Sequence, residues 1–575
     1  MPRGGWYAVP LEGLCAALAW LGLARLAERA LGWLACAPHA VWRLWLGLCK
    51  GAPPRAHSRA PGPLPEPWEG RPDLRVYRGG GGDPELLTVH TAPHSFQVDL
   101  AALATESGYF EALARSCMQE TSERRLDLGH VPSATFRAIL EWVFFGHFAL
   151  AEEELLPAIQ AAGYLLLPRF LSRCLLALRP LLGPQNCLAY LHSAEAVGCP
   201  ELRAEVCRYL SAHLLELAEP VTAGLAPPLR EELARLRLGS LPQLCVLRAE
   251  NVSKLQPGAT LGPLQGLYRR PLPPEEGDWR CATRLPFQAD KWSFSAAQLF
   301  NYLFLVGGYR ERHGARGFAF RMAAFRYNPL TDAWQATATP SKRRRHFSTA
   351  VSGQFIFAIG GWYLDSLLAP DSSTCLHRAV ERYDPWADRW TFVSPLPLGG
   401  TSFTISLAHS LPLCMAHAGS IYALGSLRHT GEKLLLHYCV ATDTWQELRP
   451  SLARADADLP ALCFLGGAEP LYVVGSGARG TVVAAFSPGA RRWGAARELP
   501  GRGAAGQGVA RDGLLYVASP DRGAVLQLEL GGPRCRELPP PPFPLSYEAF
   551  CILHFPGAPE GRSPGRAGAL QSDAG

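Results

Sequence analysis

The sequence has no pair of cysteines spaced C-x-x-C, although sixteen cysteines are scattered from Cys15 to Cys551. This removes the usual basis for a structural zinc site, and so long a chain is unlike a small secreted disulfide scaffold. The chain also has little net charge, +6 over 575 residues, which argues against a dedicated nucleic-acid-binding protein. We therefore expect reduced thiols in the cytoplasm, no metal site and no nucleic-acid partner.

Sequence motifs of enzymes are also missing. There is no G-x-x-x-x-G-K-[ST] phosphate loop and no H-E-x-x-H metal helix, and the sixteen histidines have no ligand spacing. Gly475-Ser476-Gly477 is not a G-x-S-x-G nucleophile elbow and fits a turn better. The acidic run Glu152–Glu154 stands where a helix is expected to start, and the helix dipole favours acids there. We predict a protein that is not an enzyme, with no catalytic residue and no cofactor.

The first fifty residues are rich in Leu, Ala and Trp, most of all in residues 14–49. Arg25, Glu28 and Arg29 interrupt this stretch, so its uncharged runs fall short of the roughly 20 residues that span a bilayer. The three charges would share one helix face, which is typical of an amphipathic helix. Two interpretations stay open: a helix in weak contact with a membrane surface, and a helix that binds a partner or self-associates.

Composition divides the rest of the chain. Residues 51–72 are Pro-rich and read as a linker, and residues 73–255 have the apolar spacing of helices after an alternating, strand-like stretch at 86–98. From about residue 275 short apolar runs end in glycines and turn signals recur, while residues 557–575 have the composition of a disordered tail. We expect an α+β domain with a helical extension, followed by an all-β domain.

Pairs of aromatic residues seven positions apart recur through the second half of the chain. The four pairs are Tyr327 and Trp334, Tyr383 and Trp390, Tyr438 and Trp445, and Phe486 and Trp493. The intervals between successive tryptophans are 56, 55 and 48 residues, a period typical of repeat architectures. Each pair follows an apolar run that ends in small residues such as Gly307-Gly308. This pattern predicts four-stranded blades that bury their aromatic rings against one another around an axis.

The double glycine followed by a separated Tyr and Trp resembles the kelch repeat. The resemblance implies an all-β propeller of five or six blades over residues 275–556. Trp279 resembles part of an outermost strand that lacks its inner partners. We expect the late segment 546–555 to supply a strand to the same blade and so to close the ring.

The N-terminal half resembles a BTB domain followed by a BACK domain. Residues 96–120 follow the BTB pattern of a helix before a Ser-x-Tyr-Phe element, and residues 183–210 resemble the opening of a BACK domain. The resemblance implies an α+β BTB domain over residues 73–180 and an all-α BACK domain over residues 181–260, in a multidomain chain that forms a homodimer. Thr88 and Asp99 depart from the Asp and His that the family usually has at these positions.

The resemblance also implies a contact with cullin-3. The family motif is an apolar residue, any residue, then Glu, and Met118-Gln119-Glu120 occupies its place. Met118 would enter an apolar cleft while Glu120 bonds at the rim. The implied function is a substrate-recognition adaptor of a cullin-3 RING E3 ubiquitin ligase. The alternative is a scaffold for a cytoskeletal partner such as actin, without a ligase role.

Basic residues gather in the loops expected on one face of the propeller, from the first blade to the start of the second. Arginines suit the bidentate recognition of carboxylates and phosphates. We therefore predict a substrate with an acidic or phosphorylated segment. The residues expected to bind it are Tyr309, Arg310, Arg312, Arg343, Arg344, Arg345 and Trp362.

Overall fold

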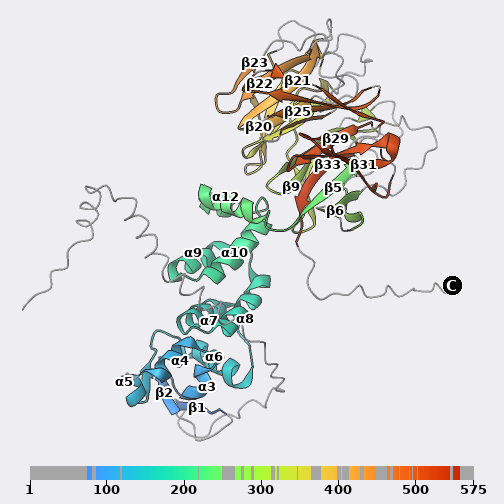
Figure 1. The fold of residues 1–575 in the computed structure, drawn as a ribbon. Coiled ribbons are helices and arrows are strands. Elements are labelled where there is room, and N and C mark those ends of the chain that lie inside the picture. Colours follow the sequence, from blue (N-terminus) through green and yellow to red (C-terminus); the bar gives the residue numbers. More distant parts are fainter. Residues whose placement is uncertain are drawn as a thin grey trace, which may run out of the picture. The chain divides into compact units, whose positions relative to one another are not determined.

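The computed structural model forms two compact units, residues 1–150 and 151–575 (Figure 1). The residues that it describes are 74–79, 86–116, 119–217, 219–248, 266–272, 277–286, 291–311, 318–319, 323–345, 347–363, 377–397, 403–404, 413–427, 433–448, 463–466, 470–477, 479–490, 492–494, 496–501, 503–543, 545 and 548–556. The segment predicted at 1–50, the linker at 51–72 and the tail at 557–575 lie outside these ranges. Among the described helices, none is long and apolar enough to cross a membrane.

The described part of the first unit is a four-stranded sheet with helices. In the order β1-β3-β2-β4, the strands are β1 (Leu74–Tyr77), β3 (Ser95–Asp99), β2 (Leu86–His90) and β4 (Arg125–Asp127). The helices are α3 (Leu100–Ala104), α4 (Gly108–Arg115), α5 (Gln119–Ser122) and α6 (Ser133–Phe145). The alternation predicted at 86–98 is found in β2 and β3, which bury Val89 and Phe96.

Two side chains explain where the short helices of this unit begin. The Ser107 side chain caps α4 by accepting a hydrogen bond from Phe110 N at 3.2 Å. The Asp99 carboxylate caps α3 by accepting a hydrogen bond from Ala102 N at 3.3 Å, and it accepts another from Gly79 N at 3.1 Å. Asp99, one of the two residues that depart from the BTB pattern, thus has a local structural role in this chain.

The second unit opens with helices α7 (Glu152–Tyr164), α8 (Pro168–Leu178), α9 (Cys187–Val197), α10 (Pro200–Ala212), α11 (Glu219–Gly224) and α12 (Pro227–Leu236). Proline stands in the first turn of α8, α10 and α12, where its missing N–H is not needed. Bidentate ion pairs from Arg179 to Glu205 and from Arg203 to Glu232 join these helices. We call residues 152–236 the helical arm.

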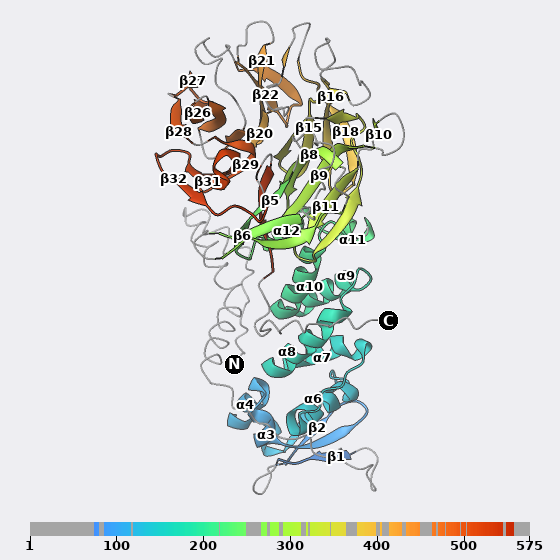
Figure 2. The same cartoon turned by 90° about the vertical axis from the view of Figure 1, so that its right-hand side faces the viewer.

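Most of the described strands that follow group into six blades. The propeller that they build is drawn in the upper part of Figure 2. Blade 1 is β8 (Lys291–Leu299), β9 (Tyr302–Glu311), β11 (Ala324–Asn328) and β12 (Ala333–Thr337); blade 2 is β14 (Ser348–Ser352), β15 (Phe355–Ile359), β17 (Val380–Asp384) and β18 (Arg389–Val393); blade 3 is β20 (Leu413–His417), β21 (Ser420–Leu427), β22 (Lys433–Cys439) and β23 (Thr444–Glu447). Blade 4 is β24 (Cys463–Gly466), β25 (Leu471–Gly477), β26 (Gly480–Ser487), β27 (Arg492–Trp493) and β28 (Arg497–Pro500); blade 5 is β29 (Ala505–Arg511), β30 (Leu514–Ser519), β31 (Ala524–Glu529) and β32 (Cys535–Leu538). Blade 6 is β33 (Glu548–His554), β5 (Pro242–Arg248), β6 (Gly266–Pro271) and β7 (Arg280–Arg284).

The inner strands of these blades follow one another around the ring in the order β8, β14, β20, β24, β29 and β33. The ring closes where Ile552 N of β33 donates to the Gln298 side chain of β8 at 3.1 Å. Buried clusters lie between successive blades; the one between blades 6 and 1 contains Leu247, Leu303, Tyr327 and Leu553. The predicted all-β propeller is confirmed, with six blades in the described residues.

The closing blade confirms one prediction and corrects another. Segment 548–554 does join the blade whose outermost strand follows Trp279, as expected. Within this blade, however, β33 is the innermost strand and it pairs with β5 along the whole of Pro242–Arg248. The two strands lie side by side in Figure 1. The propeller therefore begins at residue 242, inside the range assigned to the BACK domain and well before residue 275.

Candidate ligand-binding face of the propeller

The basic run at residues 342–345 carries the chain from blade 1 to blade 2. Within it, β13 (Arg344–Arg345) pairs with β16 (Trp362–Tyr363), so that Arg345 stands opposite Trp362. Strand β13 also adjoins β9, whose last residues include Tyr309 and Arg310. The backbones of Arg345 and Trp362 therefore come together, beside the strand that carries Tyr309 and Arg310. Arg312 lies outside the described residues, as do the side chains of Tyr309, Arg310, Arg345 and Trp362.

Arg344 is not on the surface. Its side chain is wholly buried, and it forms an ion pair with the equally buried Glu381. Its Nη1 donates to the carbonyl oxygens of Gly360 and Ala379, both at 2.9 Å. The prediction that Arg344 contacts substrate is therefore corrected: this residue holds the loop in place from beneath.

The same buried groups fix the backbone of the basic run. The Glu381 carboxylate accepts the backbone N–H groups of Ser341 at 2.6 Å and Lys342 at 3.1 Å. His377 Nε2 lies 3.0 Å from the Arg343 carbonyl oxygen, and burial, together with nearby Arg344, lowers the His377 pKa to about 4. The ring is thus neutral near pH 7, and Nε2–H donates to this carbonyl because a carbonyl can only accept. A loop held in this way loses little conformational entropy on binding a ligand.

Two cationic side chains point outward from this fixed loop. Lys342 and Arg343 are exposed, and the Lys342 Nζ lies 5.8 Å from the centre of the Phe392 ring on β18. Phe392 itself is 55% exposed, so its ring offers apolar surface to the solvent. We call Lys342, Arg343 and Phe392 the basic–aromatic patch. It offers positive charge beside an apolar surface.

Sequence reasoning missed Phe392, Glu381 and His377. Glu381 alone carried a usable signal, because it stands between the apolar Val380 and the repeat tyrosine Tyr383 on a strand expected to be buried. A carboxylate buried at such a place needs a cationic partner. Nothing local to residues 342–345 indicated that the third residue of the run was this partner.

Comparison with known proteins gives an independent view of the same chain. A model described as the BTB/POZ domain matches residues 86–179, and one described as the Kelch motif matches residues 343–397. Kelch repeat and BTB domain-containing protein 13 of Homo sapiens is 29% identical over 497 residues, which cover 83% of this chain and 97% of that protein. Kelch-like protein 42 of Mus musculus is 28% identical over 304 residues, covering 48% of this chain and 59% of that protein. Kelch domain-containing protein 7A of Mus musculus is 34% identical over 168 residues, covering 29% of this chain and 18% of that protein.

The chain belongs to the BTB–kelch family.

The BTB–kelch assignment agrees with the fold at both ends of the chain. The BTB match begins at the first residue of β2 and includes the Ser107-capped helix α4. The Kelch motif match begins at Arg343 and runs through blade 2, so it contains Glu381, His377 and Phe392. Proteins of this family are typically non-enzymatic adaptors or scaffolds.

The predicted cullin-contact residues of this BTB–kelch protein follow α4 directly. Glu120 is exposed in the first turn of α5, whereas Met118 lies outside the described residues. In the described parts of the chain, no three His, Cys, Asp or Glu side chains gather as metal ligands would.

Proposed function

We propose that this BTB–kelch protein is the substrate-recognition adaptor of a cullin-3 RING E3 ubiquitin ligase, without enzymatic activity of its own. The BTB domain would form the homodimer and contact cullin-3 through Met118 and Glu120. The propeller would bind the substrate. The family membership supports this division of labour, and the exposure of Glu120 fits a residue that meets a partner.

The observation that carries the substrate part is the fixed loop of blade 2. Its backbone is held by Glu381 and His377, so Lys342 and Arg343 extend from one backbone conformation. We propose that an acidic or phosphorylated segment binds there, with Tyr309, Arg310, Arg312, Arg345 and Trp362 completing the site. Charge complementarity of this kind speeds association and selects partners.

A scaffold for a cytoskeletal partner is the second candidate. The basic–aromatic patch favours it equally, because a filament such as actin is acidic and would also meet positive charge. In either case we propose that the protein acts in the cytoplasm, with residues 14–49 as a weak contact to a membrane.

Capture of purified cullin-3 by the full-length protein separates the two functions. The Met118→Ala/Glu120→Ala variant should lose capture and keep its melting temperature, because residues that serve a partner and not the core usually cost under about 0.5 kcal/mol when they are replaced. Glu123→Ala, an exposed glutamate close by, is the matched control and should bind cullin-3 as the wild type does. Absence of capture by the wild type would leave the scaffold function in its place.

A further inference from the structure

The segment that joins the helical arm to the propeller reverses the usual pattern of burial. Leu236, Leu238 and Leu241 are exposed by 48%, 47% and 78%, whereas Arg237 among them is only 1% exposed. Burying a guanidinium is costly unless every donor finds a partner. Arg237 therefore needs a structural explanation, and its surroundings supply one.

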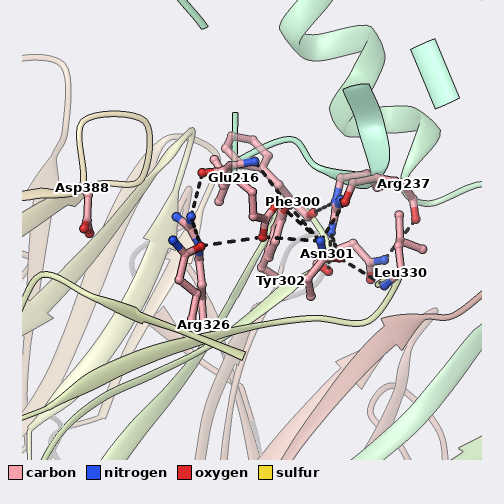
Figure 3. A network of polar contacts seen from close by, with 12 residues as sticks. Glu216, Arg237, Phe300, Asn301, Tyr302, Arg326, Leu330 and Asp388 are labelled. Carbon is pink, nitrogen blue, oxygen red and sulfur yellow. Dashed lines mark hydrogen bonds and ion pairs between the residues drawn. The ribbon is translucent and has the colours of Figure 1, made fainter. Parts of the chain in front are cut away.

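All five N–H donors of Arg237 are satisfied, by acceptors from both sides of the junction (Figure 3). The acceptors are the carbonyl oxygens of Ser211 and Ala212 at the end of α10, those of Phe300 and Asn301 in the β8–β9 turn, and the Asn328 side chain at the end of β11. The guanidinium also lies over the Tyr302 ring, 3.8 Å from its centre. A cation at the last carbonyls of a helix is further favoured by the helix dipole.

Side chains of the propeller also donate hydrogen bonds to the arm and to Arg237, which follows it. Asn301 Nδ2 donates to the Arg237 carbonyl at 3.1 Å and to the His554 carbonyl at 2.8 Å, so the closing strand β33 is tied to the same point. Asn328 Nδ2 donates to the Ala212 carbonyl at 2.7 Å. Arm, first blade and closing blade therefore meet at one set of hydrogen bonds.

A second set of bonds lies beside the first. Burial raises the pKa of Tyr302, so its hydroxyl stays protonated and donates to Glu216 at 2.7 Å. The Tyr302 oxygen accepts Leu215 N at 3.2 Å, and Arg326 Nη2 donates to the Leu215 carbonyl at 2.7 Å. Both residues of the arm are thus held by buried groups of blade 1.

The turn that faces Arg237 has an unusual backbone. Phe300 and Asn301 have φ of 51° and 56°, a region that costs a bulky residue such as phenylalanine energy. The Phe300 carbonyl reaches Arg237, and its ring lies 5.9 Å from that of Trp386, over which Arg230 of α12 lies at 4.9 Å. The strained conformation therefore occurs where blade 1 meets the arm.

We propose that Arg237 is a positioning residue that holds the helical arm and the propeller as one rigid body. A ligand on the propeller then keeps a constant position relative to the arm. The rigid connection does not depend on the proposed function; its use, delivering substrate at a fixed place to a bound ligase, rests on that function.

Distances between the two parts test the rigid connection. Labels are placed through unnatural amino acids at exposed Ala196 of α9 and exposed Ala441 of blade 3, because native thiols would take up cysteine reagents. Distances are measured by pulsed electron paramagnetic resonance on the full chain. The wild type should give one narrow distribution and Arg237→Ala a broad one. Arg235→Ala, which removes an exposed arginine two residues away, is the matched control and should stay narrow.

Arg237→Lys guards against a variant that fails to fold. Lysine keeps the charge but has three donors in place of five, so the distribution should also broaden while thermal unfolding stays cooperative. A narrow distribution for folded Arg237→Lys and Arg237→Ala would overturn the proposal.

The proposed delivery of substrate at a fixed place is tested by a separate measurement. In a reconstituted ligase, Arg237→Lys should transfer ubiquitin about tenfold more slowly with unchanged ligand and cullin binding, because a loose tether lowers the effective concentration of substrate. A transfer rate equal to that of the wild type would overturn the delivery role. A wild type that transfers no ubiquitin would contradict the proposed function and leave the distance result standing.

Discussion

Asp388 accepts the hydroxyl hydrogen of Tyr383 at a distance of 2.6 Å, and the same Oδ1 atom accepts Ala338 N of the preceding blade at 2.9 Å. Trp390 Nε1 donates to the Ala338 carbonyl at 2.9 Å. Tyr383 and Trp390 face each other across the outer hairpin, with ring centres 5.1 Å apart. The seven-residue spacing thus places the two aromatic residues opposite each other on the two strands of a hairpin. Together with the aspartate in the turn, they bond this blade to the preceding one.

Removing that aspartate should destabilise the propeller. Asp388→Ala leaves the Tyr383 hydroxyl and the Ala338 N–H without their acceptor, at a cost of about 1–3 kcal/mol. Asp512→Ala is the matched control, because Asp512 has the same left-handed backbone and an exposed side chain outside any such fastening. Chemical unfolding followed by tryptophan fluorescence measures both. Equal losses of stability in the two variants would show that the turn conformation, and not the hydrogen bonds of Asp388 to Tyr383 and Ala338, stabilises the fold.

The equivalent pair in blade 3 should make stability depend on pH. Burial raises the pKa of Asp443, but hydrogen bonds from the Tyr438 hydroxyl and Ser394 N outweigh it and leave that pKa lowered. A lowered folded pKa means that the carboxylate stabilises the fold above its unfolded pKa of about 3.9, and that this is lost as pH falls through the folded value.

Asp443→Asn keeps an acceptor but has no charge to titrate. Its melting temperature should lie below that of the wild type from pH 7 to about pH 5 and approach it below about pH 4. In a Tyr438→Phe background the difference should shrink, because one of the bonds that lower the pKa is gone. A difference that stays constant across this range would contradict the assignment.

The spacing of aromatic residues made the blades predictable, because each hairpin is local in sequence. The closing strand pair was only half predictable. Strand β33 was expected, but β5 lies in a stretch with the leucine content of the preceding helices, and its partner is some 300 residues away. Arg344 was misjudged for the same reason: four adjacent cations look solvated, and only Glu381, 37 residues on, explains why one is buried. Local sequence patterns carry no information on which residues pair across long sequence separations.

The closing strand β33 should be essential for folding, whereas residues 557–575 should not. Deleting residues 548–575 removes Ala549, Cys551, Leu553 and Phe555 from the cluster shared with blade 1 and exposes the edge of β5. At about 1.5–3 kcal/mol for each large apolar side chain, this loss matches much of a domain's stability. Deleting only residues 557–575 should leave the melting temperature unchanged. A cooperative, wild-type transition for the longer deletion would refute the closure.

Two adjacent arginines should behave in opposite ways. Arg344→Ala leaves Glu381 buried without its cation and should cost about 3–5 kcal/mol. Arg343→Ala, at an exposed position, should change stability by under about 0.5 kcal/mol. Differential scanning calorimetry of both variants measures the contrast. If Arg344→Ala were as stable as Arg343→Ala, the buried ion pair would not be what holds the loop.

The basic–aromatic patch should bind acidic peptides through charge. A fluorescent peptide with phosphoserine among acidic and apolar residues serves as the probe, and anisotropy reports its affinity. Binding should weaken steeply with salt, since the charges of Lys342 and Arg343 are exposed. Lys342→Glu/Arg343→Glu should lower affinity about tenfold, since up to about 1 kcal/mol of attraction is lost at each position and is replaced by repulsion.

Two further variants locate the peptide on this face. Phe392→Ala should weaken binding while leaving its salt dependence intact, because it removes apolar contact without changing charge. Arg389→Glu reverses an equally exposed cation on the same strand, three residues from Phe392, and should have little effect. Since Glu381 and His377 hold the loop in every one of these variants, the melting temperatures should agree with that of the wild type. A peptide whose affinity responds neither to salt nor to the double reversal would place the substrate site elsewhere on the propeller.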